Sequence, residues 1–197
     1  MAGCGTQSTS DRQGLSGSEC KAWEAKQEQG KKDVAATKGA LAAYRADPGG
    51  AQGKTFAGAM TKAFGEGGLS AGNLAKLDKA LGKLEGFYND PGTAQGGKYD
   101  LYKAGDWSGG GTIRGGQVAF GTGYFASTGT HSRMATIHEP MHLQGFQMGR
   151  DMQMKYPNGY YYGVYGPGSV QTYARSNPAG AQNNIESWAC LIARACN

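Results

Sequence analysis

The sequence predicts an α+β fold, with helices first, a small mixed sheet in the middle and further helices toward the end. Apolar residues recur at steps of three and four in the first part, as in amphipathic helices. Later, short apolar runs separated by glycines indicate strands, without the strand–helix alternation of a parallel α/β fold. A length of 197 residues suits one domain. We expect a flexible segment over 1–18 and a single domain over 19–197, divided into a helical part (19–92) and a functional part (93–197).

The first part is expected to form three helices. The first runs from Ser18 to about Ala46, where Asp47-Pro48-Gly49-Gly50 ends it. A shorter helix is expected over Phe56–Phe64. Ser70 then caps a third helix, because serine is a favoured N-cap residue. The apolar stripe of this third helix consists of Leu74, Leu77, Leu81, Leu84 and Phe87.

The second part begins with three short strands, which are predicted at 99–102, 112–114 and 117–120. A helix is expected over 131–149, followed by a loop rich in tyrosine and glycine over 156–168. The chain then ends in a helix. The residues of this last helix that we expect to face inward are Ile185, Trp188, Leu191 and Ile192.

Charge and cysteine content narrow the class of protein. The net charge is +5, and no run of five or six basic residues marks a nucleic-acid partner. No run of 18 apolar residues indicates a membrane span. Cysteines stand at Cys4, Cys20, Cys190 and Cys196, without a CxxC motif. On one helix the last two would be about 9 Å apart, too far for a disulfide, so we expect bridges between the two ends and an oxidising compartment. Reduced, buried thiols are the alternative.

The chemistry centres on the run His138-Glu139-Pro140-Met141-His142. Histidines at i and i+4 share one helix face and can bind one zinc ion, and Glu139 can take a proton from water there. The alternative is an ordinary helix that carries two histidines. Pro140 disfavours a helical conformation at Glu139, so we expect the helix to begin near Ile137 or to kink at Glu139.

Two histidines leave the site one protein ligand short. Spacing alone does not choose among the remaining candidates, although a carboxylate is the ordinary ligand. These candidates are His131, Asp151, Tyr162, Tyr165 and Glu186.

Several stretches, in order, resemble the deuterolysin-type zinc peptidases (aspzincins), and most of all their lysine-specific metallo-endopeptidase branch. The likeness covers roughly residues 98–192, about half of the chain, and implies a zincin-like fold with one Zn²⁺. The stretches are Val118–Gly121 with Phe125, Arg133–Glu139, Tyr165-Gly166, Ala174–Ala179 with Ala181, and Asn184-Ile185-Glu186.

This resemblance implies that His138 and His142 are zinc ligands, that Glu139 is the general base and that Tyr165 stabilises the oxyanion. The family pattern continues as Gly-Thr-x-Asp-x-x-Tyr-Gly. Here Gly159 is retained, but Tyr160 replaces the threonine, Tyr162 replaces the ligand aspartate, and the preceding loop is longer. The third ligand is therefore Tyr162 as a phenolate, or Asp151 from the longer loop, or the metal site is weak or lost.

Glu186 takes the place of the acid that, in the lysine-specific branch, lines the pocket for the substrate's lysine. The resemblance implies selection of a basic residue on the prime side of the cut. The family's second pocket acid is Ala189 here. The alternative is that Glu186 caps a helix or hydrogen-bonds a zinc histidine.

The sequence thus predicts a secreted or exported zinc endopeptidase that acts on protein or peptide substrates. An immunity or inhibitor protein would be a further partner if the chain is the toxin part of an exported protein. The alternative is a catalytically weak or inactive binding or effector protein on the same fold. A third reading is an unrelated hydrolase or a cell-wall-binding toxin domain.

Overall fold

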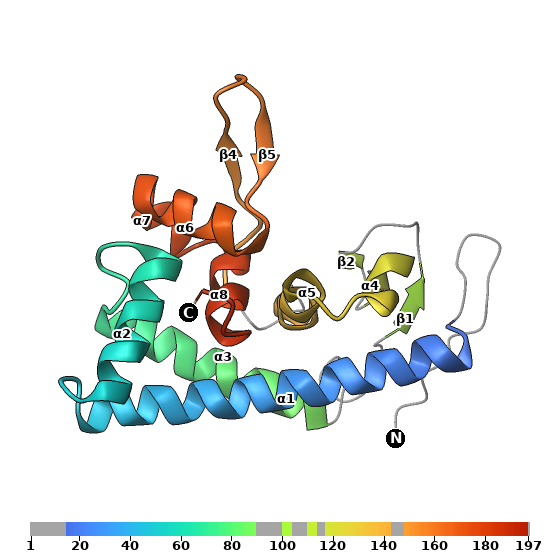
Figure 1. Cartoon of the computed structure of the whole chain (residues 1–197), viewed down its shortest axis with the longest axis horizontal. Coiled ribbons are helices and arrows are strands. Elements are labelled where there is room, and N and C mark those ends of the chain that lie inside the picture. The colour runs from blue at the N-terminus through green and yellow to red at the C-terminus, as the bar shows by residue number, and fades with distance from the viewer. Residues whose placement is uncertain (1–14, 90–99, 104–109, 114–116, 143–147, 197) are drawn as a thin grey trace.

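The computed structural model describes residues 15–89, 100–103, 110–113, 117–142 and 148–196, and it confirms a mostly helical α+β fold (Figure 1). The N-terminal segment expected to be flexible lies largely outside the described residues. In chain order the elements are α1 (Gly17–Ala46), α2 (Ala51–Phe64), α3 (Ala71–Asn89), β1 (Asp100–Lys103), β2 (Gly110–Ile113), β3 (Gln117–Phe120), α4 (Thr122–Ala126), α5 (Thr130–Met141), β4 (Gln153–Lys155), β5 (Tyr161–Gly163), α6 (Gly166–Ser176), α7 (Pro178–Ala181) and α8 (Ile185–Ile192).

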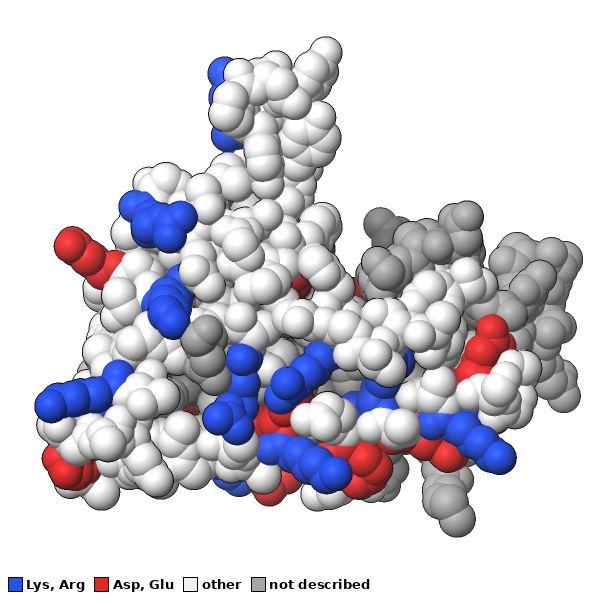
Figure 2. Space-filling view, viewed as in Figure 1, with Lys and Arg blue, Asp and Glu red and all other residues white. Residues whose placement is uncertain are grey.

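The three predicted N-terminal helices are present, with α2 and α3 packed against the long α1 (Figure 1). The first helix is capped by Ser16 rather than Ser18, because the Ser16 hydroxyl accepts from the Glu19 amide while the Glu19 carboxylate accepts from the Ser16 amide. The second begins at Ala51, five residues earlier than expected. Ser70 caps α3 as predicted, with its hydroxyl 3.3 Å from the Asn73 amide. Mixed charges line the edge of the molecule along α1 (Figure 2), as expected for a solvated helix face.

The predicted mixed sheet is confirmed. Its strand order is β1-β3-β2, with β1 parallel and β2 antiparallel to the central β3. From the end of β3, at the buried Phe120, the chain passes through α4 into α5. The sheet therefore leads directly into the helix that carries the histidine pair.

Pro140 lies in the last turn of α5, which begins at Thr130. Of the two expectations for this helix, the start near Ile137 is wrong, and the kink at Glu139 stays a prediction. Proline cannot donate to the carbonyl of Thr136, four residues earlier. The Tyr88 hydroxyl of α3 donates to that oxygen instead, at 2.8 Å. Gly30 of α1 leaves the space for this ring, since a Cβ there would lie 2.7 Å from Tyr88 Cζ. The fold thus accommodates the proline by replacing one backbone donor with a side chain.

The prediction that this helix extends to residue 149 is wrong, because α5 ends at Met141 and residues 148 and 149 are not helical. The loop predicted over 156–168 is also wrong. The chain instead forms a hairpin of β4 and β5, which projects from the body of the molecule, and then enters α6 (Figure 1). The hairpin turn contains Gly159 with φ 86°, and the amide of Tyr156 bonds the carbonyl of Tyr160 across it at 2.9 Å.

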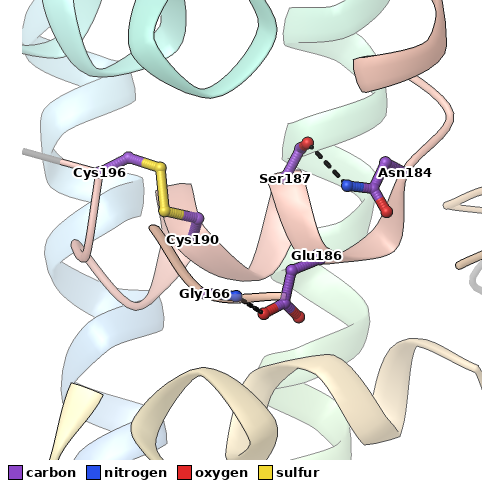
Figure 3. Close-up of a disulfide and its surroundings, with 6 residues drawn as sticks. All are labelled: Gly166, Asn184, Glu186, Ser187, Cys190 and Cys196. Carbon is purple, nitrogen blue, oxygen red and sulfur yellow. Dashed lines mark hydrogen bonds between the residues drawn. A yellow bond between two sulfur atoms is a disulfide. The ribbon is translucent and has the colours of Figure 1, made fainter. Parts of the chain in front are cut away.

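The expected bridges between the two ends are wrong, because Cys190 and Cys196 form a disulfide with a Cα–Cα distance of 5.3 Å (Figure 3). The two residues do not share a helix, since α8 ends at Ile192 and Arg194 adopts a left-handed conformation (φ 56°) that turns the chain back. Cys20 is disulfide-bonded as well, and no cysteine of the described residues is free. These disulfides are consistent with an extracellular protein.

The apolar core joins the N-terminal helices to α5, α6 and α8. Ile185, Trp188, Leu191 and Ile192 are all buried, as predicted for the last helix. The Trp188 ring packs on Phe64 of α2, with the ring centroids 4.3 Å apart. Within the described residues, no helix is long and apolar enough to cross a membrane.

Candidate metal centre

His138 in the last turn of α5 and His142, the C-cap of this helix, lie four residues apart on one face. Their Nε2 atoms lie 2.9 Å from each other, and the two rings meet edge to face. His138 is buried, whereas the His142 side chain is 24% exposed. Two imidazole nitrogens at this distance repel through their lone pairs unless a proton or a metal ion lies between them. The two histidines are therefore placed so that both can bind the same cation.

Asp151 completes a three-residue group. Its Oδ1 lies 3.2 Å from His138 Nε2 and 3.4 Å from His142 Nε2. One donor atom from each of the three residues falls within 4.8 Å of the others, so the group could hold a metal ion. Two nitrogens and one carboxylate oxygen are a common protein donor set for zinc, and they leave a coordination position open. Of the candidate third ligands, Asp151 is the one gathered with both histidines.

The segment that carries Asp151 is fixed against the start of α8. Gly149 has φ 120°, and a Cβ there would lie 2.1 Å from the Asn183 carbonyl oxygen, so only glycine permits this approach. The Arg150 amide then donates to the Asn183 carbonyl at 2.9 Å. The Asn184 side chain, fully buried, accepts from the Met152 amide at 3.4 Å. Asp151 is thus held on both sides, by a backbone contact at Arg150 and by the Asn184 side chain at Met152.

Glu186, in the first turn of α8, lies behind the histidine pair. Its Oε2 is 2.6 Å from His138 Nδ1. Its Oε1 accepts from the Gly166 amide at 2.8 Å (Figure 3). The carboxylate requires a proton on Nδ1, which leaves the Nε2 lone pair of neutral His138 for a metal. Of the two readings of Glu186, the structure contains the hydrogen bond to a histidine.

The charges of the site favour a cation at the histidines. Burial by itself lowers the pKa of His138, but hydrogen bonds to Asp151 and Glu186 outweigh it and raise this pKa to about 10. Burial by itself raises the pKa of Asp151, but hydrogen bonds from the two histidines hold it well below its usual range. Without a metal the cluster therefore binds a proton where a metal would sit. This donor set fits zinc.

Glu139 and Tyr165 border the group. Glu139 is buried, and its Oε1 lies 4.0 Å from His138 Nε2. Tyr165 stands at the N-cap of α6 and is 55% exposed. Burial raises its pKa, and so do the negative charges of Asp151, Glu186 and Glu139. The phenol therefore lies within the field of the site and keeps its proton at neutral pH.

Tyr162 and His131 make their contacts elsewhere. Tyr162 lies on β5, is 50% exposed, accepts a hydrogen bond from Asn158 and packs its ring against Tyr156, both within the hairpin. The His131 ring lies against Gly166, where a Cβ would be 2.5 Å from its Nε2. Neither residue shares the contacts that join the histidine pair to Asp151.

No family model and no curated protein matches the chain.

Proposed function

We propose that the protein is a zinc-dependent endopeptidase of zincin-like fold, similar to the deuterolysin-type peptidases, with His138, His142 and Asp151 as the metal ligands. One observation carries the proposal: three donor atoms converge beside the buried carboxylate of Glu139. Three protein ligands, an open position and an adjacent general base are the minimum for metal-assisted hydrolysis.

Each residue then has a defined task. Zinc bound here would supply a Lewis acid that polarises the peptide carbonyl and lowers the pKa of water. Glu139 accepts the proton of the attacking water and passes it to the leaving amine. Tyr165, which keeps its proton, donates a hydrogen bond to the oxyanion. Glu186 orients His138 through Nδ1.

In this assignment, the β4–β5 hairpin separates the aspartate of the family pattern from its tyrosine–glycine pair. Asp151 takes the part of the ligand aspartate, and Tyr165-Gly166 remains the tyrosine–glycine pair. The β4–β5 hairpin lies between them, which accounts for the longer loop. In this assignment Tyr162 belongs to the hairpin and not to the metal site.

Zinc content measured by elemental analysis tests the ligand set, on protein purified without a chelating resin. We expect about one zinc per chain, a loss of zinc in His142→Ala and Asp151→Ala, and no change in Tyr162→Phe. The Tyr162 variant is the matched control, because it removes the other candidate oxygen. Zinc lost in Tyr162→Phe and kept in Asp151→Ala would refute the assignment of Asp151.

Activity is tested by digesting a proteome-derived peptide library and identifying the new termini by mass spectrometry. We expect cleavage by the zinc-loaded protein and none by Glu139→Gln, which should still bind zinc. A preference for lysine on the prime side stays a prediction, and the library reads it directly. Zinc bound without any cleavage would favour the alternative, a binding or effector protein on the same fold.

A further inference from the structure

The β4–β5 hairpin concentrates exposed aromatic side chains. Tyr160, Tyr161 and Tyr162 are 69%, 61% and 50% exposed, and Tyr165, two residues after β5, is 55% exposed. Among the described residues, these four are the large hydrophobic side chains that are exposed. Single exposed hydrophobic residues are ordinary, whereas a cluster on a projecting element marks an interaction surface.

One face of the hairpin is turned toward α6 and the core. Met154 and Tyr162 pair across the two strands, so their side chains share this face. Met154 packs against the core, and the Tyr156 hydroxyl lies 3.2 Å from the Ser169 hydroxyl of α6. These contacts hold the hairpin in place and leave its opposite face open.

The opposite face leads into the metal centre. Gln153 pairs with Gly163, and Lys155 pairs with Tyr161, so these four residues share it. The Tyr165 ring lies over Gly163, since a Cβ there would be 2.1 Å from the ring. The Lys155 ammonium lies 6.0 Å from the centroid of the Tyr161 ring. We call Tyr165, Gly163, Tyr161 and Lys155 the aromatic row, because they follow one another outward from the metal centre.

We propose that the aromatic row binds an extended segment of the polypeptide substrate on one side of the cleaved bond, and that Lys155 selects an acidic side chain there. This inference rests on the proposed peptidase activity. The row begins at Tyr165. The next residue, Gly166, donates its amide to Glu186, which in turn bonds His138. A substrate strand that leaves the metal centre can therefore continue along the row.

The positive charge of the hairpin favours an acidic side chain in the substrate. Residues 152–164 contain Lys155 and no aspartate or glutamate, and the hairpin shows blue and no red atoms in Figure 2. Lys155 follows Asp151 by four residues, which at about 3.3 Å per extended residue is roughly 13 Å. A substrate strand of the same pitch would therefore meet Lys155 about four residues from the cleaved bond. The tyrosine rings supply apolar contact before that point.

The peptide library tests this inference with Lys155→Glu, Tyr161→Ala and Lys54→Glu, the last being a matched charge reversal on an exposed lysine of α2. We expect the parent protein to enrich aspartate and glutamate about four residues from the cut, on one side only. Lys155→Glu should reverse this preference to lysine and arginine, and Lys54→Glu should keep it. Tyr161→Ala should lower kcat/KM about tenfold on an acidic peptide from the library, without loss of zinc.

A binding measurement separates failure of this inference from failure of the proposed activity. In Glu139→Gln, a fluorescein-labelled random copolymer of glutamate and tyrosine should bind, and added Lys155→Glu should abolish the binding. A copolymer of lysine and tyrosine should bind the double variant Glu139→Gln/Lys155→Glu and should not bind Glu139→Gln alone. Cleavage without an acidic preference, or equal copolymer binding by both variants, overturns the role of the aromatic row. If copolymer binding depends on Lys155 but no peptide is cleaved, the proposed peptidase activity is refuted, and the aromatic row is kept as a peptide-binding surface.

Discussion

Replacing Tyr88 by phenylalanine should destabilise the protein, because the buried carbonyl of Thr136 loses its hydrogen-bond donor. The Tyr88 hydroxyl donates to Thr136 O at 2.8 Å, and both residues are nearly inaccessible, at 3% and 2% exposure. Water cannot readily replace the hydroxyl, and Pro140 has no N–H to offer. A buried acceptor left without its donor costs about 1–3 kcal/mol. At about 2–4 °C per kcal/mol for a chain of this size, the Tm should fall by roughly 2–12 °C.

Pro140→Ala supplies the missing donor and makes the reasoning testable. With alanine at 140, its N–H can bond Thr136 O within the helix, so the loss of the Tyr88 hydroxyl should cost less. The double-mutant cycle should give a coupling of about 1 kcal/mol between positions 88 and 140. Urea unfolding, followed by circular dichroism, measures all four proteins.

The matched control is Tyr44→Phe, which removes the hydroxyl of a half-buried tyrosine on α1 that packs against Phe56. This variant should change the stability by less than about 0.5 kcal/mol. If Tyr88→Phe costs the same with proline and with alanine at position 140, the hydroxyl does not replace the missing amide, and the account of Pro140 fails.

Three further predictions concern the neighbouring structure. Arg133→Met should cost about 2–4 kcal/mol in urea unfolding, because it leaves the Asp33 carboxylate, 3% exposed, without its guanidinium partner; a loss below 0.5 kcal/mol would contradict this. Burial raises the pKa of Tyr124, so only the unfolded chain loses this proton near pH 10, and stability should fall above that pH by up to about 1.4 kcal/mol per unit. Tyr124→Phe should reduce this slope, and an unchanged slope would show that it has another origin. Asn184→Ala should weaken zinc binding about 10–100-fold in chelator competition, because the segment of Asp151, the proposed oxygen ligand, loses a contact; unchanged affinity would show that the backbone contacts suffice.

The elements that the sequence predicted well are those with a local signal. The leucine stripe after Ser70, the strands between glycines and the apolar face of the last helix depend on residues close in sequence. The disulfide was misjudged because it depends on where α8 ends, and the left-handed Arg194 carries no local mark. The effect of Pro140 on α5 does not follow from the sequence for a similar reason, since the donor that compensates for the proline is a tyrosine of another helix.

In the candidate site, the histidine pair and Glu139 follow from helical spacing, whereas the proposed third ligand does not. Asp151 reaches the histidines because Gly149 and Asn184 attach its segment to α8, and this contact joins parts of the chain about thirty residues apart. One signal was available. The run Pro157-Asn158-Gly159 is a turn signal between short β-forming stretches, and a hairpin there removes Tyr162 from the loop that it was assigned to.

Helix α8 contributes no ligand to the proposed metal, yet its N-cap and its first turn restrain two of the proposed ligands, which come from different stretches of the chain. Asn184 fixes the segment of Asp151, and Glu186 fixes the ring of His138. Both side chains are buried, so these hydrogen bonds are shielded from water. The same helix is anchored in the core by Trp188, which is fully buried. Through α8, the packed core therefore restrains the metal centre. The exposed side chains of the hairpin between Asp151 and Tyr165 can vary without displacing a proposed ligand.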